Sequence, residues 1–186
     1  MRLLLIWLLI WICFTSSAQC GKERWHVKTL SDKDTVKIDF KNRIKTTINT
    51  QAKLPKPAKI PKNMPRQNTE FNVYTIDCYI IEYKRETDKD IHIVLRDLKS
   101  NATMVAEIPS PECPEVQRTS RYKKFADLYT WFTVNIGKPT SSFKTLPKPV
   151  KVRITGVGFY DFIHGQRGMA PNGREIHPVL SISLWN

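Results

Sequence analysis

The side chains best suited to chemistry lie close together in one glycine-rich segment near the carboxyl terminus, residues 161–178. This segment contains two of the three histidines that follow residue 66. Its candidate functional residues are Asp161, His164, Asn172, Glu175 and His177. Imidazole and carboxylate groups bind divalent metal ions and act as general bases, so the segment is a candidate for either chemistry. Its glycines and its Asn-Gly turn would fold it tightly.

A second set of candidates lies in residues 90–97, where apolar and polar side chains alternate as they do in a strand. Asp90, His92 and Arg96 are its polar members that could face a ligand. His92 could complete a divalent-metal site with the two histidines and one of the two carboxylates of residues 161–178. The spacing of these residues matches no established ligand pattern.

Three interpretations of these residues are open on the sequence alone. In the first, the imidazoles and carboxylates bind a divalent metal ion without catalysis. In the second, the protein is a metal-dependent hydrolase or nuclease, in which one histidine is a general base and a carboxylate-bound cation activates water. In the third, the segment is structural: Asp161 and Glu175 accept hydrogen bonds from loop amides, and the histidines donate to carbonyl groups. The sequence therefore leaves open whether the protein is an enzyme.

Five predicted strands and one predicted helix must position these residues. Runs of β-branched and aromatic side chains predict strands at residues 71–83, 90–97, 103–108, 150–159 and 179–184. Aromatic residues at helical spacing over residues 121–134 predict a helix whose aromatic face packs in the core. This order of elements predicts a mainly β fold, a five-stranded Greek-key barrel of the OB type with its helix between the third and fourth strands. A split sandwich is the competing architecture.

The chain divides into three regions by composition. A basic residue, an apolar run and a group of small residues predict a secretory signal peptide over residues 1–18. Residues 19–66 form a basic arm with 13 Lys+Arg and 4 acidic residues, and the arm ends in an extended linker rich in Pro and Lys. Its segments 24–30 and 35–40 could add a short strand or pack on the core. Residues 67–186, with 16 Lys+Arg and 13 acidic residues, form the barrel domain.

The signal peptide and the charge bound the location and the partners. We expect a secreted or periplasmic protein, with lipidation of Cys20 as an alternative. No membrane span is expected, because the apolar run of about a dozen residues is shorter than the ~20 residues that a spanning helix needs. The formal charge of +13 favours anionic partners. We therefore expect a binding module for nucleic acid or another anionic polymer, with a metal-dependent hydrolase and a purely structural domain as alternatives.

Three cysteines, Cys20, Cys78 and Cys113, follow the predicted signal peptide. Export places them in an oxidising compartment, where one disulfide and one free thiol are expected. We predict that Cys78 pairs with Cys113, because both lie in the predicted folded region, whereas Cys20 lies near a mobile end. The sequence contains no CxxC spacing, so a metal site made of cysteine thiolates is not expected.

Three sequence patterns resemble those of a group of secreted, largely uncharacterised bacterial proteins. The pattern DxHxxL begins at Asp90, and EIPxPxC begins at Glu107. The third pattern contains HGQxGxAPNGxExHP and lies within residues 156–178, where Tyr160 replaces a Phe. The resemblance covers about residues 70–184 and implies a small OB-like β-barrel domain. It implies no activity.

Overall fold

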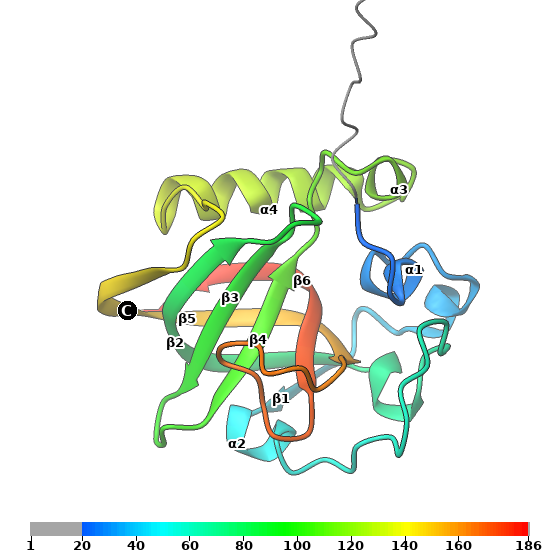
Figure 1. The fold of residues 1–186 in the computed structure, drawn as a ribbon, viewed down its shortest axis with the longest axis horizontal. Helices are drawn as coiled ribbons and strands as arrows, with labels where there is room; N and C mark the ends of the chain where they lie inside the picture. The colour runs from blue at the N-terminus through cyan, green and yellow to red at the C-terminus, as the bar shows by residue number, and fades with distance from the viewer. Residues whose placement is uncertain (1–19, 186) are drawn as a thin grey trace, which may run out of the picture.

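The computed structural model describes residues 20–185, so the predicted signal peptide, residues 1–18, lies outside them. The described chain is mainly β, and one six-stranded sheet curls into a near-closed barrel (Figure 1). The strands are β1 (Arg43–Thr46), β2 (Val73–Arg85), β3 (Ile91–Asp97), β4 (Thr103–Ile108), β5 (Lys144–Tyr160) and β6 (Arg174–Leu184). The helical segments are α1 (Trp25–Lys28), η1 (Lys33–Lys37), α2 (Ile48–Gln51), η2 (Asn68–Phe71), α3 (Pro114–Gln117) and α4 (Tyr122–Asn135). None of the helices in this range is long and apolar enough to cross a membrane.

The pairing of β2 with β5 closes the ring of strands. The order around the ring is β2, β3, β4, β6 and β5, and β5 then returns to β2. Every pair in the ring is antiparallel except β4 with β6, which run parallel. β1 lies outside the ring and pairs in parallel with residues 73–76 of β2. The structure is therefore a single curled sheet with one added strand, and not two separate sheets.

Both β5 and β6 begin well before the predicted positions, β5 at Lys144 and β6 at Arg174. Prolines lie within both strands, and because proline donates no backbone N–H it usually indicates a strand end. Pro178 falls where the β5–β6 register shifts, so the ladder continues on either side of it. Glu175 and His177 are consequently strand residues, not loop residues as the sequence suggested.

The inward-facing side chains of the strands fill the barrel. Ile91, Ile93 and Leu95 are fully buried there, on the face of β3 that the sequence alternation predicts to be apolar. In the chain, α4 lies between β4 and β5, and in Figure 1 it lies across one end of the barrel. Its predicted aromatic stripe is only partly correct. Phe125 and Phe132 are fully buried, but the first aromatic residue of the helix is exposed.

The predicted disulfide between Cys78 and Cys113 is wrong. Cys113 is bonded to Cys20, with the two Cα atoms 5.8 Å apart. Cys78 is free and lies in the barrel core, whereas Cys113 belongs to a second apolar cluster outside the barrel that also contains Trp25 and Val116. The sheet separates the two thiols, and burial raises the pKa of the Cys78 thiol. The disulfide therefore fixes the arm to the domain at Cys20.

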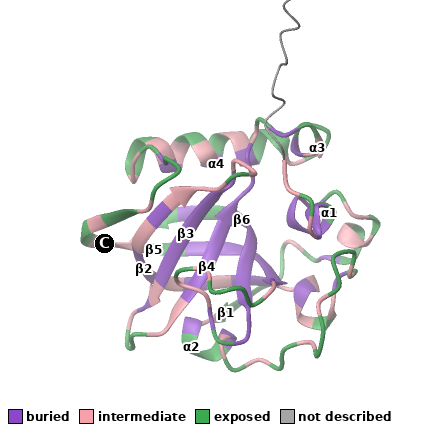
Figure 2. Ribbon diagram, viewed as in Figure 1, coloured by how far each residue is buried: buried purple, intermediate pink, exposed green. Residues whose placement is uncertain are grey.

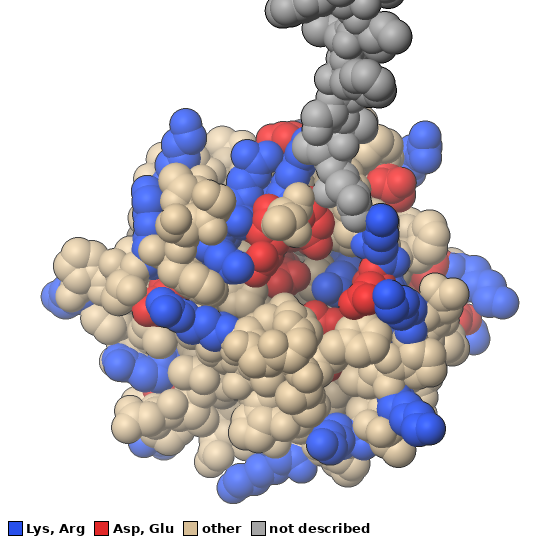
Figure 3. Space-filling view, viewed as in Figure 1, with Lys and Arg blue, Asp and Glu red and all other residues tan. Residues whose placement is uncertain are grey.

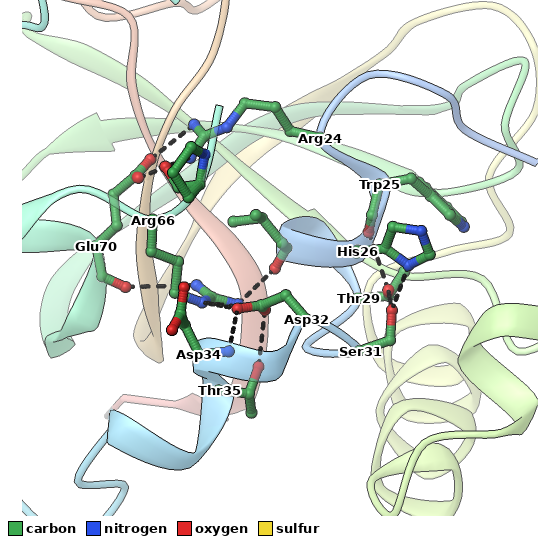
Figure 4. Close-up of polar contacts among 12 residues, drawn as sticks. Arg24, Trp25, His26, Thr29, Ser31, Asp32, Asp34, Thr35, Arg66 and Glu70 are labelled. Carbon is green, nitrogen blue, oxygen red and sulfur yellow. Dashed lines mark hydrogen bonds and ion pairs between the residues drawn. The ribbon is translucent and has the colours of Figure 1, made fainter. Parts of the chain in front are cut away.

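Buried charged pairs also hold the basic arm against the barrel (Figure 4). Arg24 Nη2 lies 2.7 Å from Glu70 Oε2, and both side chains are fully buried. Arg24 Nη1 also donates to the carbonyl oxygen of Tyr160 (2.7 Å). Near the end of the arm, Arg66 Nη2 lies 2.7 Å from Asp32 Oδ2, which joins two parts of the arm, and Arg66 Nη1 donates to the carbonyl oxygen of Glu70 (3.4 Å). The two arm segments that the sequence left open form α1 and η1, and they pack on the domain instead of adding a strand.

Candidate metal centre

A row of titratable side chains crosses the outer face of β3, β4 and β6. His92 of β3 is directly opposite Glu107 of β4. β4 and β6 run parallel with Val105 opposite Glu175, so the next outward-facing positions, Glu107 and His177, also lie side by side. The row therefore reads imidazole, carboxylate, imidazole across three neighbouring strands.

The contacts of this row continue to Asp90, just before β3. Glu107 Oε1 lies 3.1 Å from His92 Nδ1, and Glu107 Oε2 lies 3.0 Å from His177 Nδ1. His177 Nε2 lies 3.4 Å from Asp90 Oδ2, and Asp90 Oδ1 accepts a hydrogen bond from Ser110 N (2.8 Å). The His177 ring is close to both carboxylates but is not aligned to donate a hydrogen bond to either. All four side chains of this chain of contacts are buried.

The partners of His92 define where its charge must lie. His92 Nε2 is 3.1 Å from the carbonyl oxygen of Arg167, which only accepts, so Nε2 carries a proton. Nδ1 faces two carboxylate oxygens, Glu107 Oε1 at 3.1 Å and Glu86 Oε1 at 3.3 Å. An unprotonated Nδ1 would present its lone pair to both oxygens and be repelled by them. A positive charge, either a proton or a metal ion, must therefore lie at this point.

The pKa shifts in the row follow from burial and from the alternation of acid and base. Burial opposes the charged form of both imidazoles, but the Glu107 carboxylate raises the pKa of His92 and of His177. Burial also opposes ionisation of Glu107, but His177 holds the pKa of that carboxyl well below its usual range. At Asp90, burial is the largest effect and raises the pKa. Without a metal ion, protons shared between the imidazoles and the carboxylates would have to balance the negative charge of the row.

A pocket of about 460 Å³ opens beside the row. Its lining contains five acidic side chains and two lysines, namely Glu23, Glu86, Asp88, Glu107, Asp161, Lys22 and Lys28. This acidic excess contrasts with the formal charge of +13 for the whole chain. In Figure 3, acidic side chains gather around a hollow on this face, and lysines and arginines lie around it. The pocket is therefore suited to a cation.

Two further carboxylates, Asp161 and Glu175, lie next to the row. Glu175 is fully buried, and neither of its oxygens has a hydrogen-bond partner in the described part of the chain. Burial, followed by the charge of Asp161, raises the pKa of Glu175 well above its usual range. Lys28 Nζ, from α1, lies 3.4 Å from Asp161 Oδ2. Burial also raises the pKa of Asp88, to about 7.

Other parts of the chain cover the strand face that carries the row. Figure 2 shows β3, β4 and β6 buried along most of their length, because their outer face is shielded as well as their inner one. Residues 161–173 fold over this face, and Gly168 (φ 83°) comes so close to Val94 that a Cβ atom there would clash. The row therefore lies beneath the surface, and Glu107 is its member that lines the pocket.

The structure brings five of the predicted site residues together. Asp90, His92 and His177 meet in the row through Glu107, although they come from different ends of the barrel sequence. From the sequence, we expected the candidates in residues 161–178 to lie in a loop. In the structure, the pairing of β4 with β3 and with β6 aligns His92 with His177. Asp161 and Glu175 lie beside the row, as described above.

Three predicted residues lie apart from the row. His164 is exposed at the edge of the pocket. Asn172 is buried, but its amide donates to two backbone carbonyls of the arm (2.9 and 3.0 Å), so it fastens the arm to the barrel. Arg96 lies farther along β3, with its guanidinium carbon 5.4 Å from the ring centroid of Tyr79. Of the three histidines expected at a metal, the structure brings two together.

Sequence reasoning missed three residues at this site. Glu107 could have been found from the sequence, because a hairpin that turns near residue 100 places it opposite His92. Glu86 lies in the turn between β2 and β3, a position that loop composition alone does not distinguish. Lys28 reaches the site only because the disulfide and the buried ion pairs fold the arm back, and no local pattern predicts that path.

A comparison with protein-family models found no match, and a comparison with curated protein sequences found none either. The resemblance to secreted bacterial proteins therefore stays a prediction, and what the chain can do must be argued from the site itself.

Proposed function

We propose that this protein is an exported, OB-like β-barrel module that binds one divalent metal ion through Glu86, His92 and Glu107. The observation that carries the proposal is the orientation of His92. Its Nε2–H is fixed by a backbone carbonyl, while Nδ1 points between two carboxylate oxygens at 3.1 and 3.3 Å. Histidine ligands of metal ions characteristically donate their other ring N–H to a carbonyl or carboxylate group.

The two separations that involve His92 fit a small divalent ion, and all three donor atoms lie within 4.8 Å of one another. Metal–nitrogen and metal–oxygen bonds of about 2.0–2.2 Å place adjacent ligand atoms roughly 2.8–3.6 Å apart, from octahedral to tetrahedral angles. The distances from His92 Nδ1 to Glu107 and to Glu86 both fall in this range. One imidazole with two carboxylates favours a first-row ion such as Zn²⁺ or Mn²⁺ over Ca²⁺, which prefers oxygen ligands alone.

The remaining residues of the row would support the metal ligands. Glu107 uses one carboxylate oxygen toward His92 and the other toward His177, which is in turn backed by Asp90. Such partners fix the orientation of a ligating carboxylate and tune its charge. Glu86 and Glu107 both line the pocket, so an ion has a path from solvent.

The proposed OB type of the barrel is supported by strand order. The ring contains three consecutive antiparallel strands, a helix before the fourth strand, and a parallel pair between the third and the last ring strands, β4 and β6. Export is supported by the Cys20–Cys113 disulfide, since such bonds persist mainly in oxidising compartments.

The test is a metal count on the purified chain from residue 19 with its disulfide intact. After equilibration with Zn²⁺ or Mn²⁺ and dialysis, elemental analysis should find one ion per chain. His92→Ala should lose it, whereas His164→Ala, which changes an exposed histidine at the edge of the pocket, should keep it. If the wild type binds no metal, or if both variants bind equally, the proposal is wrong. Plasmid and RNA added to the loaded protein test the hydrolase alternative.

A second candidate function, binding of an anionic polymer, is favoured by a different surface. On the outer face of the sheet, Tyr79 pairs with Arg96 on one side and with Lys151 on the other. Lys151 Nζ lies 3.8 Å from the ring centroid of Trp185, so cations and aromatic rings alternate across four positions. Such surfaces bind single-stranded nucleic acid through phosphate contacts and base stacking. Titration with single-stranded DNA at several salt concentrations tests it: Lys151→Glu should weaken binding, and Lys123→Glu on α4 should not.

A further inference from the structure

The far half of the row holds a second set of donor atoms that come together. Asp90, Glu107 and His177 each offer one ligand atom, and these three atoms all lie within 4.8 Å of one another. His177 Nδ1 is 3.0 Å from Glu107 Oε2, and His177 Nε2 is 3.4 Å from Asp90 Oδ2. The first ion is placed on the side of Glu107 Oε1, which faces His92, so Glu107 Oε2 remains for this set. One imidazole and two carboxylates therefore form a second ligand set beside the first.

Three donor atoms of this set are buried and have no hydrogen-bond partner among residues 20–185. They are Asp90 Oδ2, His177 Nδ1 and His177 Nε2, and both side chains are fully buried. Ser110 N donates to the other oxygen of Asp90, Oδ1, and so leaves Oδ2 unsatisfied. A buried carboxylate oxygen without a donor is costly unless a proton or a cation lies next to it. The set therefore has the unpaired donor atoms of a cation site.

The orientation of the His177 ring fits a metal ligand better than a hydrogen-bond donor. An N–H group needs its acceptor close to the N–H axis. Neither carboxylate oxygen lies in that direction, although each is within 3.4 Å of a ring nitrogen. Around a metal ion, the neighbouring ligand oxygens do lie to the side of the nitrogen lone-pair axis, because they occupy adjacent corners of the coordination polyhedron. The ring of Phe159, with its centroid 5.5 Å from that of His177, packs against the imidazole.

We propose that Asp90, Glu107 and His177 form a second, weaker site for a divalent first-row ion, and that Glu107 bridges the two ions. Pairs of neighbouring ions are common in metal-dependent proteins. This inference shares Glu107 with the proposed function, but it does not require the first ion. Charge supports it, because two divalent ions carry four positive charges and four carboxylates lie around them. They are those of Glu86, Asp88, Asp90 and Glu107.

The pocket and the burial of the set determine how the second ion binds. Glu107 lines the pocket and connects the set to it. Asp88 also lines the pocket, and its Oδ1 accepts a hydrogen bond from Asp90 N (3.2 Å). Because Asp90 and His177 are fully buried, an ion between them must lose its hydration water, which is costly. We therefore expect the second ion to stay bound only while free metal is present and to be lost on dialysis.

The test is an ion count on the purified chain from residue 19 at saturating Mn²⁺. Bound ions are counted by ultrafiltration without dialysis, and coupling between neighbouring ions is sought by electron paramagnetic resonance. The wild type should bind two ions with a coupled signal. Asp90→Asn keeps an acceptor for Ser110 N but removes the charge, so it should bind one ion without coupling. Glu175→Gln is the matched control and should match the wild type, because Glu175 is another fully buried carboxylate, two residues before His177, that lies outside the set.

His92→Ala separates this inference from the proposed function, because it removes a ligand of the first site only. At saturation this variant should still bind one ion, without coupling. Two ions in the wild type and one in each of Asp90→Asn and His92→Ala support both sites. A single ion that only His92→Ala removes overturns the second site and leaves the first standing. A single ion that only Asp90→Asn removes contradicts the first site and supports the second.

The other outcomes also decide the matter. Two ions in Asp90→Asn overturn the second site, because the extra ion then lies elsewhere, and no ion in the wild type contradicts both sites. Loss of the second ion in Glu175→Gln as well would overturn the assignment of its ligands. If Asp90→Asn does not fold, the wild type decides alone: one ion at saturation, or two ions without coupling, overturns the inference.

Discussion

Replacement of Arg24 by methionine tests whether the basic arm is part of the folded domain. Arg24 and Glu70 are fully buried and are joined by two hydrogen bonds of 2.7 and 2.8 Å. Removing one partner of a buried ion pair typically costs about 3–5 kcal/mol, because the other charge is left uncompensated. Glu70 keeps two backbone donors, the amides of Gln67 and Tyr160, both at 2.7 Å. We therefore expect Arg24→Met to cost about 3 kcal/mol, at the lower end of that range.

The assay is urea and thermal unfolding followed by circular dichroism. For a domain of this size, a loss of about 3 kcal/mol lowers Tm by roughly 6–12 °C. The matched control is Arg153→Met, which breaks an ion pair with Asp77 at 2.6–3.0 Å on the surface, where the arginine side chain is 44% exposed. That change should cost much less stability than Arg24→Met, because solvent screens an exposed ion pair. If the two variants lose similar stability, the arm is not bound as described and cannot position Lys28.

Three further predictions concern single residues. The Cys78 thiol should not react with a thiol reagent in the folded, oxidised protein and should react once the chain is unfolded, because it is buried in the barrel core; a reactive thiol in the folded state would contradict the disulfide assignment. Gly168→Ala should destabilise the domain more than Gly165→Ala, as measured by urea midpoints, since both have positive φ but only Gly168 has a neighbouring strand in the way. The hydrogen bond from Arg153 holds the pKa of Asp77 below its usual value, so this pKa should rise in Arg153→Met when the carboxyl is followed by NMR. Because the pKa is depressed in the folded protein, the pair adds stability above about pH 4, and this stability is lost on acidification. An unchanged titration of Asp77 would refute the pairing.

The strands could be predicted where the sequence alternates without interruption. Residues 91–97 and 103–108 occupy their predicted places, because apolar side chains at every second position leave one face to bury. The start of β6 could not be predicted in the same way. Pro178 interrupts its pattern, and only the pairing with β5 shows that the ladder passes through the interruption. This error moved Glu175 and His177 from a strand to a loop.

The arm and the disulfide depended on tertiary structure that the sequence does not encode locally. A strongly basic arm is typical of a solvated segment, yet Arg24 and Lys28 are buried because their partners lie on other parts of the fold. Cys78 was a plausible partner for Cys113 by position in the chain, but alternation along β2 directs it into the barrel. The acid that joins the two histidines was missed for the same reason, since strand pairing and not sequence spacing creates the row.

The most direct test of the metal centre is a crystal structure of the protein grown with Mn²⁺ or Zn²⁺, with anomalous data collected at the absorption edge of the metal. We expect an anomalous peak within bonding distance of His92 Nδ1, Glu86 and Glu107. A map without a peak there, or with its peak at the exposed His164 alone, would contradict it.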